Sequence, residues 1–170
     1  QEGIEQSSLK TFDWYVKPDY VGATQTGSAY TPFIDIQSAI NSAADGDSIF
    51  IDGDCVVTQK ISIDPTKSLT FQGVKDRTKV RYGTYSNSND HVFHQENSSC
   101  TKTYRFLDLE VSNSGGYGIY IRSAKRVEIN NNNLKNNCWN GTGLHTVVDT
   151  ATSGVEGFDS TQAELQAFKD

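Results

Sequence analysis

Hydrophobic and polar residues alternate in short runs along most of the chain, and turn-forming residues separate the runs. Alternation with a period of two places one set of side chains on a core face and the other set in solvent, as in β-strands. We expect strands at Trp14–Val16, Ser48–Ile51, Cys55–Thr58, Lys60–Ile63, Ser68–Gln72, Lys79–Tyr82, His91–His94, Tyr104–Ser112, Gly118–Ile121, Arg126–Asn130 and Gly143–Val147.

One segment near the beginning of the chain has helical spacing instead. Its apolar stripe consists of Phe33, Ile36, Ile40 and Ala43. Thr31 is a suitable N-cap, Pro32 suits the first helical position, and Gly46 follows as a stop signal. The pattern predicts a helix over residues 32–44 that covers one end of the fold.

Two segments in the second half of the chain resemble each other at an offset of about twenty residues. Leu107 and Leu109 align with Val127 and Ile129, and a polar turn follows each strand. A period of this size with two or three strands fits one coil of a parallel β-helix, in which several coils must stack for stability. In the Asn-rich run 130–137, side-chain amides would then bond the coils above and below.

These patterns predict an all-β fold, a parallel β-helix (solenoid) of about four coils. We expect an N-terminal arm at 1–13, the β-helix with its capping helix at 14–150, and a C-terminal cap or linker at 151–170. Ser160–Lys169 has the spacing of a short helix. The chain begins at Gln1 and has no Met, so we expect a mature form or a piece of a longer protein.

The opening of the chain also resembles a known group of proteins. The matching elements are Tyr15-Val16, the loop with Gly27, Pro32-Phe33-Ile34-Asp35-Ile36-Gln37-Ser38-Ala39-Ile40, Gly46-Asp47-Ser48-Ile49-Phe50-Ile51 and Ser68-Leu69-Thr70-Phe71-Gln72-Gly73. They are similar to the cap helix and first coils of right-handed parallel β-helix proteins of the pectate-lyase-like superfamily. Gly53-Asp54-Cys55 departs from the usual Gly-x-Tyr. The resemblance implies a fold, and since that superfamily includes lyases, hydrolases, phage tailspikes and adhesins, it does not select a function.

Charge and hydropathy narrow the range of partners. The chain has 15 Lys and Arg against 21 Asp and Glu, a net charge of −6. This balance argues against nucleic acid, because phosphate binding needs clustered basic residues. No apolar run has the ~18 residues of a membrane span.

Two glycosylation acceptors and three cysteines suggest an oxidising compartment. The acceptors are Asn97 in Asn97-Ser98-Ser99 and Asn140 in Asn140-Gly141-Thr142. Three interpretations of Cys55, Cys100 and Cys138 are open: three free thiols, one disulfide and an odd thiol, or a thiol that pairs with another chain. We expect a secreted or cell-surface glycoprotein.

Three acidic residues form a candidate metal site. If the offset of twenty is the strand register, Asp108 lies beside Glu128 on the outer face, with Glu110 nearby. Adjacent carboxylates repel unless a cation or a shared proton intervenes, and oxygen ligands suit calcium. A solvated acidic face and a catalytic site are the other interpretations, and no residue is assigned a catalytic role.

Aromatic residues are frequent, at 11% of the chain. Tyr117, Tyr120 and Trp139 lie at strand ends or turns, where exposed rings stack on sugars, so we expect a glycan-binding surface; ordinary packing is the alternative. His91 and His94 are expected on opposite faces of one strand, as surface residues without a shared metal.

The sequence therefore predicts a secreted, non-enzymatic β-helix module with a structural or adhesive role. It would bind a polysaccharide or glycan and self-associate into a fibre or surface layer, because a short solenoid exposes strand edges at its ends. The alternatives are a carbohydrate-active enzyme, either a polysaccharide lyase or a glycoside hydrolase, and a glycan-binding viral appendage.

Overall fold

The chain is mostly parallel β-structure. The computed structural model describes residues 11–138, 144–146 and 154–156 of the 170 residues. Within these ranges the strands form three sheets, every strand pairing is parallel, and one short helix is present. The expected all-β class is confirmed at this level.

Each sheet takes its strands from segments far apart in the sequence. Sheet A has the order β1 (Trp14–Val16), β2 (Ser48–Ile51), β5 (Leu69–Gln72), β8 (Thr103–Leu107), β11 (Arg126–Asn130) and β14 (Gly154–Glu156). Sheet B has the order β3 (Asp54–Val57), β6 (Lys79–Tyr82), β9 (Glu110–Ser112) and β12 (Asn133–Lys135). Sheet C has the order β4 (Ile61–Ser62), β7 (Phe93–Gln95), β10 (Ile119–Ile121) and β13 (Leu144–Thr146).

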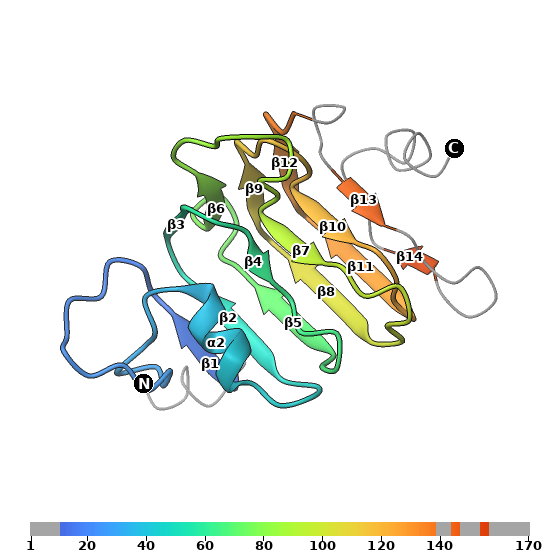
Figure 1. Ribbon diagram of the computed structural model, residues 1–170. Coiled ribbons are helices and arrows are strands. Elements are labelled where there is room, and N and C mark those ends of the chain that lie inside the picture. Colours follow the sequence, from blue (N-terminus) through green and yellow to red (C-terminus); the bar gives the residue numbers. More distant parts are fainter. Residues whose placement is uncertain (1–10, 139–143, 147–153, 157–170) are drawn as a thin grey trace.

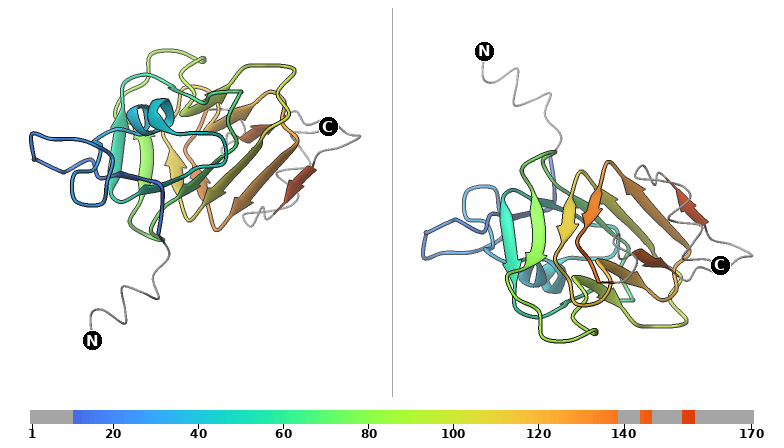
Figure 2. Two further views of the ribbon diagram at one scale, coloured as in Figure 1. Left: turned by 90° about the horizontal axis from the view of Figure 1, so that it is seen from below. Right: turned by 90° about the horizontal axis from the view of Figure 1, so that it is seen from above.

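From β2 onward the chain visits the sheets in the order A, B, C and then returns to A (Figure 1). We call one such passage a circuit. Every circuit adds one strand to each sheet. The three sheets surround a common interior in the views from below and from above (Figure 2). This arrangement is consistent with a parallel β-helix.

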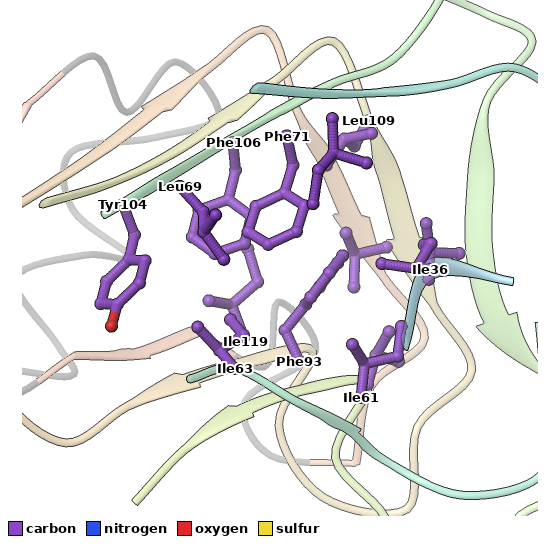
Figure 3. Close-up of a cluster of buried hydrophobic side chains, with 14 of the residues drawn as sticks. Ile36, Ile61, Ile63, Leu69, Phe71, Phe93, Tyr104, Phe106, Leu109 and Ile119 are labelled. Atoms are coloured by element: carbon purple, nitrogen blue, oxygen red, sulfur yellow. The ribbon is translucent and has the colours of Figure 1, made fainter. Parts of the chain in front are cut away.

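The interior is filled by the inward side chains of all three sheets. Phe71 and Phe106 are register partners in sheet A, and their rings stack with centroids 5.2 Å apart. Phe93 of sheet C lies 5.2 Å from each of them (Figure 3). All three rings are completely buried, so this aromatic group joins two circuits and two sheets.

The helix is shorter than expected. The predicted helix over 32–44 with Thr31 as its N-cap is corrected to α2 (Ile36–Ser42), which Asp35 caps by accepting a hydrogen bond of 2.7 Å from the Ser38 backbone N–H. Phe33 is extended instead, because its backbone bridges to Val16 and its ring stacks on Trp14 at 6.0 Å.

The N-terminal end of the fold is covered in two ways. Ile36, Ala39 and Ile40 of α2 are buried against the interior. The loop that follows β1 bonds the outer edge of this strand. The Tyr15 N–H donates to the Gly27 carbonyl (2.8 Å), and the Tyr15 carbonyl accepts from the Phe33 N–H (3.0 Å). The helix thus covers the apolar end of the interior, and the loop occupies the edge of β1 that would otherwise be open to pair with another chain.

The strand register differs from the expected offset of twenty. Val127 pairs with Tyr104 and Ile129 pairs with Phe106, an offset of 23 residues. The predicted strand Tyr104–Ser112 is divided into β8 and β9, because Asp108 turns the corner in the left-handed conformation, with φ 58°. Tyr104 and Phe106 therefore point into the core, while Leu107 is only half-buried.

The Asn-rich run forms corners and a strand. Asn131 and Asn136 have left-handed φ values of 56° and 55°, and β12 lies between them. Buried Asn132 donates to the Phe106 carbonyl at 2.6 Å and accepts from Leu109 N–H at 3.2 Å. The amides therefore bond the backbone of the preceding circuit, which satisfies polar groups at a buried corner.

Parallel pairing continues beyond the expected limit of the repeats. Gly154–Glu156, in the segment expected as cap or linker, pairs with β11 as β14. Residues 1–10 of the expected arm at 1–13 and the predicted helix Ser160–Lys169 lie outside the described residues.

We expect Phe106→Ala to lower the free energy of unfolding by about 3–5 kcal/mol, the usual loss for a buried aromatic ring. Thr70→Ala is the matched control, since Thr70 lies beside Phe71 on the outer side of sheet A; we expect less than about 1 kcal/mol. Urea denaturation followed by circular dichroism measures both, and similar losses would contradict the packed interior.

Candidate functional site

Four aromatic side chains gather on the outer face of sheet C. His94 of β7 and Tyr120 of β10 are register partners, and their ring centroids are 5.0 Å apart. His91 stacks on His94 at 5.2 Å and on Tyr120 at 5.1 Å, and it lies 5.4 Å from Tyr117. We call His91, His94, Tyr117 and Tyr120 the His/Tyr cluster.

The expected placement of His91 and His94 on opposite faces is wrong. β7 begins only at Phe93, so strand alternation does not apply to His91. Only 6% of His91 is exposed, and its Nδ1 accepts a 2.8 Å hydrogen bond from Tyr117 N–H. A ring nitrogen that accepts a hydrogen bond carries no proton, so the His91 ring in this arrangement is neutral, with its proton on Nε2.

Two glycines allow the loop before β7 to lie close to the following circuit. A Cβ added at Gly116 would lie 2.5 Å from His91 Nδ1, and one at Gly115 would lie 2.0 Å from the Asn87 carbonyl oxygen. The loop is also fixed from within, because Asp90 accepts from Ser86 N–H at 2.6 Å. His91 is therefore held against the sheet by backbone contacts that a larger residue would prevent.

Burial favours the uncharged forms of His94 and Tyr117. Burial and the Lys60 ammonium lower the pKa of His94, while Glu96, 2.8 Å from its Nε2, opposes the change. Burial, and to a lesser extent Tyr120, raises the pKa of Tyr117. An uncharged His94 and an intact Tyr117 hydroxyl leave aromatic faces with hydrogen-bonding edges, the combination that stacks on a polar ring.

A hollow of about 440 Å³ lies over these rings. Its wall consists of the four rings of the cluster together with Lys60, Ser88, Asn89 and Glu96. The structure thus brings together Tyr117 and Tyr120 of the expected glycan-binding set. The third member, Trp139, lies outside the described residues.

The carboxylates expected to bind calcium do not form one group. Glu128 pairs with Arg105 in the register that corrects the predicted offset, and it makes ion pairs with Arg105 and with Arg126. The expected adjacency of Asp108 and Glu128 is therefore wrong. Across the described residues, no group of three or more His, Cys, Asp and Glu side chains has an arrangement that could hold a metal ion.

Asp108 and Glu110 line a second hollow, of about 310 Å³, at the corner between sheets A and B, together with Lys75 and Lys79. Asp108 accepts a hydrogen bond from Gln72 Nε2 at 2.8 Å. Glu110 lies 3.3 Å from the Lys135 ammonium. This groove is lined by acidic and basic side chains, and the carboxylates of Asp108 and Glu110 already have partners.

The expected modification sites and cysteines fall in different environments. Asn97 is exposed in the segment between β7 and β8, whereas Asn140 lies outside the described residues. All three cysteines are free thiols, with Cys55 and Cys100 buried and Cys138 exposed. The disulfide alternative is therefore absent from the structure.

Comparison with protein-family models, with curated proteins and with solved structures finds no match. In the described part of the chain, no helix is long and apolar enough to cross a membrane.

The charges around His94 give opposite predictions for two variants. We expect Lys60→Gln to raise the pKa of His94 and Glu96→Gln to lower it further. The folded pKa lies below the ordinary value of about 6.5. At a pH between the folded and the unfolded pKa of His94, this residue binds more protons in the unfolded chain than in the folded chain. The free energy of unfolding therefore decreases as the pH falls through this interval.

Ring-proton chemical shifts of His94 against pH, in wild type and both variants, measure these pKa values directly. Arg122→Gln is a control, because Arg122 pairs with Glu96 at 3.7 Å and does not contribute to the pKa shift of His94, so this variant should change the pKa least. Shifts of the same sign in the Lys60 and Glu96 variants would contradict the assigned electrostatics.

Proposed function

We propose that the chain is a right-handed parallel β-helix of the pectate-lyase-like kind that binds a glycan through the His/Tyr cluster. In this proposal it is a non-enzymatic adhesive or structural module, secreted or at a cell surface. The gathering of His91, His94, Tyr117 and Tyr120 around one hollow carries the proposal.

The order of the strands supports the fold part of the proposal. Three parallel sheets are visited in a fixed order, and successive strands of each sheet are joined by long connections through the other two. Crossovers between parallel strands of one sheet are right-handed in nearly all proteins.

The chemistry of the hollow supports a sugar as the ligand. A pyranose ring has an apolar face of C–H groups and an edge of hydroxyls. The rings of Tyr120 and His94 would cover the apolar face, while Glu96, Asn89 and Ser88 supply partners for hydroxyls. An uncharged His94 requires no opposite charge on the ligand.

We expect Tyr120→Ala to weaken glycan binding at least about tenfold, equivalent to ~1.4 kcal/mol. The probe is a panel of neutral and acidic oligosaccharides, and the measurement is titration calorimetry on unglycosylated chain. Tyr30→Ala is the matched control, because Tyr30 is 92% exposed and lies outside the cluster.

Melting temperatures of both variants separate lost binding from lost folding. If no oligosaccharide of the panel binds the folded wild-type chain, or if both tyrosine variants lose binding equally, the proposed site is wrong.

The groove between sheets A and B favours a second candidate, a carbohydrate-active enzyme. Lys79 and Lys75 lie in its wall with Asp108 and Glu110, so a base and acidic groups are near one another. The leading proposal predicts no new absorbance of an unsaturated uronate when the chain is incubated with acidic polysaccharides. If an unsaturated uronate forms and Lys79→Ala abolishes its formation, the chain is a polysaccharide lyase and the proposal of a non-enzymatic module is wrong.

A further inference from the structure

The acceptor Asn97 lies close to the His/Tyr cluster along the outer side of sheet C. A hollow of about 380 Å³ has Asn97, Pro65, Ile63 and Ser62 in its wall. This hollow shares His94 and Glu96 with the one over the cluster. The two hollows therefore adjoin at His94 and Glu96. We call the two together the trough, and Asn97 lies in the wall of the part that does not include Tyr120.

The side chain of Asn97 is oriented by its own turn. Its Oδ1 accepts a hydrogen bond of 2.7 Å from Ser99 N–H, while its backbone N–H donates to Gln95 Oε1. An Asx turn of this kind fixes the amide by its oxygen. The Nδ2 atom, to which a sugar would be attached, makes no hydrogen bond within the described part of the chain.

The trough offers the same chemistry along its length. Pro65 and the edge of Ile63 present apolar surface near Asn97, and the rings of His94 and Tyr120 continue it. Glu96 lies between the two hollows, where its carboxylate can accept from hydroxyl or N-acetyl N–H groups.

From this geometry we infer that Asn97 carries an N-linked glycan whose first sugars lie in the trough and stack on the His/Tyr cluster. The inference rests on the proposed function, since it assigns an occupant to the same site. Attachment converts binding into an intramolecular event with a high effective concentration, so a weak contact suffices. The glycan at Asn97 thus regulates the site by competing with external glycans.

The test compares two forms of the full chain secreted from eukaryotic cells, both with Thr142→Ala so that Asn140 cannot be modified. One form keeps the Asn97 acceptor. The other carries Ser99→Ala, which removes the acceptor motif but keeps the Ser99 backbone N–H and hence the turn. Glycopeptide mass spectrometry first measures the occupancy of Asn97.

We expect nuclear Overhauser contacts between sugar protons and the ring protons of His94 and Tyr120 in the glycosylated form. We also expect this form to bind an external glycan at least about tenfold more weakly than the Ser99→Ala form. Tyr120→Ala in the glycosylated chain should remove the sugar contacts while the Asn97 glycan remains attached.

Unmodified Asn97 in the secreted chain would overturn the inference, and so would a glycan without contacts to either ring. These outcomes are distinguishable from failure of the proposed function. If no external glycan binds the Ser99→Ala form, the proposed function fails, while the ring contacts still decide where the Asn97 glycan lies.

Discussion

The register between parallel strands of successive circuits determines the rest of this structure. Each strand is bonded along its length to the strand of the preceding circuit, and side chains alternate between the interior and the outer face. A shift of one residue would bring Arg105 or Glu128 inward and Phe106 outward. The aromatic interior of Phe71, Phe93 and Phe106 excludes such a shift, so packing and hydrogen bonding specify the same register.

The same constraint positions the His/Tyr cluster. Tyr120 lies over the outer face of sheet C because Phe93 and Ile119, its neighbours in the ladder, point inward as register partners. His91 joins the two outer residues from a loop rather than from a strand, which requires Gly116 beneath it. In this site, strand register therefore positions His94 and Tyr120, and a local close contact with Gly116 positions His91.

Periodicity predicted most strands but not the corners between them. Ser48–Ile51, Lys79–Tyr82 and Arg126–Asn130 have the expected bounds, since alternation and flanking turns specify both ends. The predicted register was wrong because Leu107 and Leu109 fit one continuous strand pattern that passes through Asp108. The left-handed φ of Asp108 ends the strand there, and the hydrophobic pattern of the sequence does not indicate it. Tyr117 and Tyr120 could be chosen for their location near turns, whereas the contribution of His91 depends on a loop path that alternation does not describe.

The left-handed corners restrict how related sequences can diverge. Asp108 and Asn113 stand at two corners of one circuit, and Asn131 and Asn136 occupy the same corners of the next, 23 residues later. Gly adopts this conformation readily because it has no Cβ to clash with the backbone, and Asn and Asp adopt it more often than other residues because their short polar side chains hydrogen-bond locally. During evolution one apolar residue can replace another in the core, whereas substitutions at these corner positions are restricted mainly to Asn, Asp and Gly. Distant relatives should therefore be sought by the spacing of their corners rather than by overall identity.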